Sequence, residues 1–277
     1  MSLTVNTNTA ADRAITQLNK SSRALTRSFA RISSGLRISK AADDAAGLGV
    51  AENLKVAASA AKVCQRNVVD GISMIAVAEG ATTEVAALLG RMRDLAIQGA
   101  SETLGTNERQ YLNDEFEALS AEVDRIAAVT EFNGQKLTDG VTTSIGVQVG
   151  IHATANDQET FNLGDLGATT LGIDIATIDM TTSSGCSTAL DLFDVAITMV
   201  SGYRSEYGAA ENRLNSALNN LETFSESTKT AESQIRDADF AFETAEMSRN
   251  QIMQQAGTAI LAQAKGINQG ALQLLQS

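Results

Sequence analysis

Proline and tryptophan are both missing from this 277-residue chain, and aromatic residues make up only 4% of it. A chain of average composition and this length would contain on the order of 14 prolines. Because proline breaks the interior of a helix, its absence suits a protein built from long, uninterrupted helices. Chance in an alanine-rich chain is the simpler alternative. With so few aromatic residues, alanine, leucine, valine and isoleucine must fill the core.

Positive charge is also scarce. The chain has 21 Lys and Arg residues against 33 Asp and Glu residues, which gives a net charge of −12. This argues against nucleic acid as the main partner, because binding to phosphates needs basic surface. No run of 18 apolar residues exists, so we expect no segment that spans a membrane. The first 18 residues resemble no secretory signal peptide, which leaves cytoplasmic residence or export by another route.

Residues that carry chemistry are few and scattered. Cys64 and Cys186 lie in different contexts and indicate no disulfide framework and no metal site. The only histidine, His152, has no ligand-type neighbours and is expected at the surface. The pair Asp43 and Asp44 is better placed to start a helix than to catalyse a reaction. No phosphate-binding loop or hydrolase motif occurs, so the sequence predicts no enzyme activity and no cofactor or metal.

Five stretches repeat apolar residues at steps of three and four, as amphipathic helices do. They cover residues 15–32, 61–96, 112–126, 190–235 and 252–274. The sequence therefore predicts a mainly α protein with long coiled-coil helices in a rod-like bundle; an ordinary helical bundle is the simplest alternative. The apolar faces near the two termini consist of Ile15, Leu18, Leu25, Phe29 and Ile32, and of Ile252, Ala256, Ile260, Ile267 and Leu274.

The middle of the chain, about residues 140–188, is rich in Gly, Ser and Thr. Alternation in TSIGVQVG and QETFNLGD predicts a small β-hairpin joined through ATANDQ. Helices before and after this segment bring the two termini together, and we expect residues 2–32 to pair with residues 240–275. Such a pair leaves apolar surface exposed, which implies association with other copies.

Several long motifs carry a family resemblance. RISSGLRISKAADDAAGL (31–48), GRMRDLAIQGA (90–100) and EVDRIAAVTEFNGQKL (122–137) resemble the N-terminal part of bacterial flagellin. ESQIRDADFAFETAEM (232–247) and QIMQQAGTAILAQAKGINQGALQLL (251–275) resemble its C-terminal part. The resemblance covers residues 1–137 and 187–277 and implies a short form without the variable outer domains.

The resemblance also implies a domain plan. Residues 1–42 and 236–277 would form an inner core domain whose apolar faces are the subunit interface, and residues 43–235 a surrounding rod-like domain. Residues 33–56 resemble the linker between them. The charges of Arg31, Arg37, Asp43 and Asp44 in or beside this linker would pair between neighbouring subunits; a solvated linker without specific contacts is the alternative.

The implied function is that of a structural subunit that assembles into the flagellar filament used for swimming. Many copies of itself are the main partner, and the filament cap protein, the junction protein and an export chaperone are further ones. Export would use the flagellar type III channel without cleavage of a signal peptide, which places the protein outside the cell. Arg91, Arg93, Leu95 and Glu115 match residues with which flagellins contact Toll-like receptor 5 of a host.

Two other classes of protein stay open on the sequence alone. A hook–filament junction protein shares the terminal helices, and a coiled-coil scaffold shares the periodicity. The motifs NRLNSALNNL and QAGTAILAQAKG favour flagellin over the junction protein.

Overall fold

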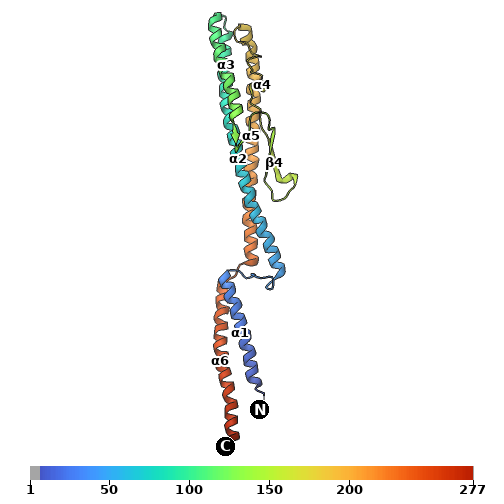
Figure 1. Cartoon of the computed structure of the whole chain (residues 1–277), viewed down its shortest axis with the longest axis vertical. Coiled ribbons are helices and arrows are strands. Elements are labelled where there is room, and N and C mark those ends of the chain that lie inside the picture. The colour runs from blue at the N-terminus through green and yellow to red at the C-terminus, as the bar shows by residue number, and fades with distance from the viewer. Residues whose placement is uncertain (1–6, 277) are drawn as a thin grey trace. The chain divides into compact units, whose positions relative to one another are not determined.

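The computed structural model describes the backbone of residues 7–276 and the side chains of residues 7–264 and 266. The chain forms two units, which are treated separately (Figure 1). A terminal unit combines residues 1–57 with residues 226–277, and a central unit consists of residues 58–225.

The terminal unit is built on two helices, α1 (Thr9–Ser34) and α6 (Phe240–Gln276), which lie side by side in Figure 1. Asn8 caps the start of α1, because its side chain accepts a hydrogen bond from the Ala11 backbone N–H, and Gly35 caps the end of the helix with φ of 71°. The Asn8 side-chain amide donates to the Ala264 carbonyl at 3.0 Å, and so ties the start of α1 to α6. The predicted pairing of the two ends of the chain is confirmed.

The central unit packs residues 58–100 of α2 (Ala45–Ala100) and residues 183–225 of α5 (Ser183–Arg236) together with α3 (Thr106–Val129). One core joins all three helices. Its centre is Phe116 of α3, which meets Phe193 of α5 edge to face with ring centroids 5.9 Å apart. The short helix α4 (Ala168–Leu171) covers the same core.

A second core in this unit lies between α2, α5 and a β-hairpin. Strands β3 (Ser144–Gln148) and β4 (Gln158–Asn162) pair antiparallel, with the 3-10 turn η1 (Ala155–Asp157) between them. Val147 and Phe161 of the hairpin are buried against the two helices. A smaller two-stranded sheet, β1 (Glu131–Phe132) with β2 (Gln135–Lys136), follows α3.

The mainly α fold class, with long paired helices and a small β-hairpin in the middle, is therefore confirmed. One boundary was wrong. The resemblance implied a linker over residues 33–56, but α2 already begins at Ala45, directly after the Asp43–Asp44 pair that the sequence analysis placed at a helix start. The Asp44 carboxylate accepts a hydrogen bond from the Gly47 N–H at 2.9 Å, which satisfies a free donor of the first helical turn. A Cβ at Gly47 would lie 2.4 Å from this carboxylate, so glycine makes room for the cap.

Among the described helices, α2 alone is long and apolar enough to cross a membrane when judged by length and composition; one 18-residue window has a mean hydropathy of 1.5. The expectation that no segment spans a membrane rested on the lack of an unbroken run of 18 apolar residues, and it stays a prediction. The apolar character of this helix has a packing origin, because α2 contributes residues to both cores of the central unit.

Candidate self-association surface

Helix α1 places its predicted apolar residues on two different sides. Ala11, Ser21 and Ser28 are buried. Half-buried apolar side chains lie on the same side of the helix as these residues: Leu18, Leu25 and Ile32. By contrast, Ile15 and Phe29 are 42% and 65% exposed. The predicted interface face therefore divides into a part that packs within the chain and a part that remains free.

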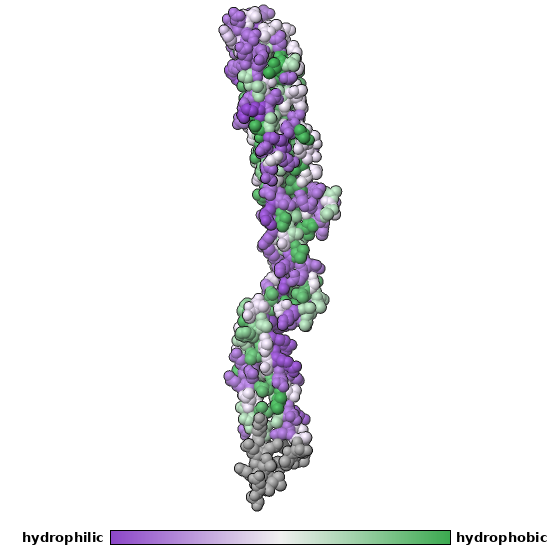
Figure 2. Space-filling model, in the orientation of Figure 1, coloured by the Kyte–Doolittle hydropathy of each residue, from purple (hydrophilic) through white to green (hydrophobic). Residues whose placement is uncertain are grey.

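Helix α6 shows the same division more strongly. Its inner side meets α1 at Gly257, where an added Cβ would touch the Leu18 side chain at 3.3 Å. The predicted residues of α6 lie elsewhere: Ile252 and Ile260 are 65% and 60% exposed, and Ala256 is exposed as well. Figure 2 shows green, hydrophobic areas on the visible face of this unit. Ile267 and Leu274 lie outside the residues whose side chains are described.

The described terminal unit thus exposes large apolar side chains along α1, along α6 and along the first part of α2. They are Ile15, Phe29, Val50, Val56, Phe240, Phe242, Ile252, Met253 and Ile260. Exposed apolar patches of this kind mark surfaces where proteins associate.

All four predicted linker charges have partners in their own chain. The Arg31 guanidinium donates to the Glu243 carboxylate at 2.9 Å. Arg37 donates from Nη2 to the Ile235 carbonyl at 2.6 Å. Asp43 accepts from the backbone N–H groups of residues 39 and 40, and these hydrogen bonds lower the pKa of its carboxyl below the usual value. Asp44 caps α2, as described above. The charged residues of the predicted linker therefore all have contacts within their own chain.

Glu243 was missed in the sequence analysis. It is 5% exposed and lies on the inner side of α6, where it holds Arg31. The only signal was that the first of the two glutamates in the FAFETAEM segment stands at a position where a helix facing α1 would otherwise carry an apolar residue.

The two chain segments that connect the terminal helices to α2 and α5 are joined to each other. Leu36 and Asp237 form an isolated antiparallel bridge. The Arg37 N–H donates to the Arg236 carbonyl at 2.7 Å, and the Arg236 guanidinium pairs with Glu52 of α2 at 2.9 Å. The segment around residues 36–37 is thus held by backbone hydrogen bonds to residues 235–238.

The residues matched to a receptor contact lie in the central unit. Arg91 and Glu115 form an ion pair at 2.6 Å, and their side chains are 54% and 42% exposed. Arg93 pairs with Asp194 at 2.7 Å. Leu95 is only 1% exposed and belongs to the core around α3, so its side chain is not accessible at the surface.

Both cysteines are buried and free. The Cys64 thiol donates to the Gly150 carbonyl at 3.1 Å, and the Cys186 thiol to the Met180 carbonyl at 3.2 Å. Burial raises the pKa of each thiol. Within the described residues, no group of His, Cys, Asp and Glu side chains is arranged to hold a metal ion.

Comparison with known proteins adds a family to this geometry. Residues 5–143 match the bacterial flagellin N-terminal helical region, and residues 190–275 match the bacterial flagellin C-terminal helical region. The chain is 41% identical to a flagellin of Halalkalibacterium halodurans, with 89% of this chain and 90% of that protein covered. It is 37% identical to a flagellin of Bacillus subtilis, with 98% and 99% covered.

A solved structure also resembles the fold. The structure of a putative flagellar hook-associated protein from Vibrio parahaemolyticus has a TM-score of 0.58 and 15% identity, over 70% of this chain and 100% of that chain. At this identity the likeness concerns the fold alone.

Proposed function

Because this chain belongs to the bacterial flagellin family and is a filament subunit of the bacterial flagellum, we propose that the exposed apolar side of its α1–α6 pair forms the main contact between subunits. The family is structural and non-enzymatic, and it self-assembles into the extracellular filament that serves motility. The proposal assigns the inner part of the filament to residues 1–42 and 236–277, and the surrounding rod to residues 43–235.

The observation that carries this proposal is the exposure of large apolar side chains on both terminal helices. Phe29 of α1 and Ile252 and Ile260 of α6 are each at least 60% exposed. Burying one such side chain completely stabilises an interface by about 1.5–3 kcal/mol. A helix pair cannot cover these residues itself, because its inner sides are already in contact. Neighbouring copies in a filament supply the missing cover.

A double substitution, Ile252→Ser with Ile260→Ser, tests the proposal. Loss of two buried isoleucines is expected to cost the filament about 3 kcal/mol, which raises the critical concentration roughly a hundredfold. Sedimentation after heating and slow cooling measures it, and electron microscopy of the pellet identifies filaments. Val141→Ser is the matched control, because this side chain is 83% exposed and lies in the central unit. Normal filaments from the double variant would contradict the assignment.

A shortened chain gives a second test of the same surface. A protein that ends at residue 242 loses nearly all of α6. We expect it to stay in the supernatant as a folded central unit, because both cores of that unit consist of residues between 61 and 221. Filaments in the pellet of this variant would show that α6 is dispensable.

The finer partners follow from the same family membership. We assign the filament cap protein and the junction protein to the ends of the assembled filament, and an export chaperone to the unassembled chain. Export through the flagellar type III channel fits the two free cysteines, because that route favours chains without disulfides. Mass spectrometry of secreted protein tests the route: an intact N-terminus is expected, and a trimmed one contradicts export without signal cleavage.

Toll-like receptor 5 of a host is proposed to contact Arg91 and Glu115 in the monomer. The two side chains lie on neighbouring helices, α2 and α3, and both are accessible. The double variant Arg91→Ala/Glu115→Ala should lose most of the reporter signal in receptor-expressing cells. Arg125→Ala/Glu122→Ala removes an equally exposed ion pair of α3 and serves as the control. A wild-type monomer that gives no signal at saturating dose would refute the contact.

A further inference from the structure

The methionine side chains of this protein differ sharply in their contact with solvent. The chain has seven methionines, of which Met1 lies outside the described residues. Met92 and Met180 are completely buried. Three others are half-buried: Met74, Met199 and Met247. Met253 of α6 is the exception among the described methionines, because it is 41% exposed.

Met253 belongs to the exposed apolar face of α6. At 3.6 residues per turn, Met253, Ala256 and Ile260 fall within roughly 60° of the helix circumference. Ala256 and Ile260 are both exposed. On its other side Met253 is followed four residues later by Gly257, which meets Leu18 of α1. Met253 therefore stands at the edge where the contact between the two helices gives way to free surface.

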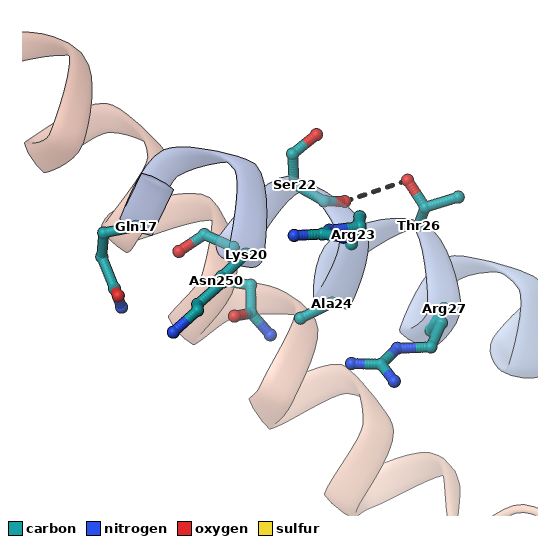
Figure 3. A pocket seen from close by; sticks show the side chains of 9 residues that line it. Gln17, Lys20, Ser22, Arg23, Ala24, Thr26, Arg27 and Asn250 are labelled. Carbon is teal, nitrogen blue, oxygen red and sulfur yellow. Dashed lines mark hydrogen bonds between the residues drawn. The ribbon is translucent and has the colours of Figure 1, made fainter. Parts of the chain in front are cut away.

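A polar groove lies beside this edge. Figure 3 shows Asn250 of α6 at the border of a groove of 720 Å³, together with Lys20 and Arg27 of α1. Most side chains that line the groove are polar, so water and small polar solutes enter it. Met253 comes three residues after Asn250, and residues three apart are neighbours on a helix surface. A small oxidant in solution therefore has access to the Met253 side chain.

Peroxides oxidise the thioether of methionine to the sulfoxide. An electron pair of the sulfur attacks one oxygen of hydrogen peroxide, an S–O bond forms and the O–O bond breaks. The sulfur is oxidised, and the peroxide is reduced to water. The reaction converts a flexible apolar side chain into a polar one without a change in the backbone.

We propose that Met253 is the site at which hydrogen peroxide modifies the free subunit, and that the sulfoxide weakens assembly. The effect on assembly rests on the proposed contact through the exposed apolar side of the α1–α6 pair. In the free subunit, water hydrates the sulfoxide oxygen. In the filament this oxygen enters an apolar contact, and burial of a polar group without a hydrogen-bond partner is unfavourable. Oxidation therefore acts on assembly and leaves the fold of the free subunit unchanged.

The first test maps oxidation in the free subunit. Protein below its critical concentration is treated with hydrogen peroxide, quenched with free methionine, digested with trypsin and analysed by mass spectrometry. Cleavage after Arg249 separates Met247 from Met253. We expect the Met253 peptide to gain an oxygen before the peptides that contain the half-buried methionines. In preformed filaments the same peptide should be protected.

The second test measures the critical concentration of polymerisation by sedimentation. Peroxide treatment should raise this concentration about tenfold in the wild type, as expected for burial of one unpaired polar group. Met253→Leu, which keeps an apolar side chain, should show the same value before and after peroxide. Met253→Gln introduces a polar side chain and should raise the value without peroxide. Met247→Leu is the matched control, because it removes the neighbouring half-buried methionine and should leave the peroxide effect intact.

Reversal gives a further check. Treatment of the oxidised subunit with the two epimer-specific methionine sulfoxide reductases should return the critical concentration to its untreated value. A peroxide effect that persists in Met253→Leu assigns the loss to another residue and overturns the inference. A lower melting temperature of the oxidised free subunit places the effect in the fold and overturns it too.

The peptide maps separate the two parts of the inference. If a half-buried methionine reacts as fast as Met253 in the free subunit, the modification site is wrong. If Met253 reacts equally in subunit and filament, its burial in the contact is wrong. A wild-type protein that forms no filaments contradicts the proposed function and with it the effect on assembly, whereas the map of the free subunit still decides the modification site.

Discussion

The aromatic pair at the centre of the central unit gives the sharpest stability prediction. Phe193 of α5 is fully buried, and its ring meets Phe116 of α3 at an interplanar angle of 62°. Replacing Phe193 with alanine removes a buried ring and leaves a cavity at a point where α2, α3 and α5 all contribute to the core. Substitutions of this kind cost about 3–5 kcal/mol. We expect that loss in the free energy of unfolding.

Two further variants divide this cost into its parts. Phe193→Leu keeps most of the volume and should cost below about 1.5 kcal/mol. A double-mutant cycle with Phe116→Leu should give a coupling energy of about 0.5–1.5 kcal/mol, which is the contribution of the edge-to-face contact. If the cycle shows no coupling, the ring geometry adds nothing beyond volume.

The assay is urea unfolding of the monomer, followed by circular dichroism at a helix wavelength. Phe224→Ala is the matched control, because Phe224 belongs to the same helix but is 38% exposed. It should cost below about 1.5 kcal/mol, since little cavity forms at a surface. An equal loss for Phe193→Ala and Phe224→Ala would refute the assignment of the core to the α2–α3–α5 packing.

Three other perturbations follow from single contacts. Arg31→Met should increase amide exchange in α1 more than Glu243→Gln does. Arg31→Met leaves the buried Glu243 carboxylate without a partner, whereas Glu243→Gln leaves the Arg31 guanidinium, which is partly in contact with solvent. Tyr207→Phe removes the hydroxyl that accepts from the buried Gly164 N–H at 2.9 Å and should cost about 1–3 kcal/mol in urea unfolding; an unchanged midpoint contradicts the contact. Cys64 should react with a thiol reagent far more slowly in the folded protein than in urea, because its thiol is buried. Since burial also raises the pKa of this thiol, its reaction in the folded protein should need a higher pH than that of an ordinary thiol. Equal rates in the two conditions would show an accessible thiol.

Much of the fold was predictable, because the helices have a strict period and the hairpin alternates. The start of α2 was predictable in part: the Asp43–Asp44 pair indicated a helix start, but the glycines at positions 47 and 49 suggested a linker that continues beyond it. Gly49 has open space around it, so nothing in its surroundings demands a glycine. Gly47, by contrast, is required by the carboxylate of Asp44 that caps the same helix. Only the three-dimensional positions of Gly47 and Asp44 show that this glycine belongs to a helix and not to a linker.

The interface could be predicted only in part, for a different reason. Periodicity identified Ile252, Ala256 and Ile260 as one apolar face of α6, and they do share a face. Yet α6 meets α1 through another side, at Gly257 and Ala264. Because both sides of α6 repeat with the same helical period, the sequence pattern alone does not say which side packs on α1 and which side stays exposed.

The two units differ in which side chains they bury within one chain, and this difference bears on which of them needs contacts with other copies. The central unit buries Phe116, Phe193 and Tyr207 in its two cores, although Tyr111 and Phe224 are exposed. The terminal unit buries small or polar residues such as Ala11, Ser21 and Ser28 between its helices and leaves Phe29 exposed. Burial of small side chains gives little hydrophobic free energy, since that energy scales with the apolar area removed from water. In the assembly that we propose, the larger side chains of the terminal helices are covered by other copies, and most of the free energy of assembly comes from the two ends of the chain.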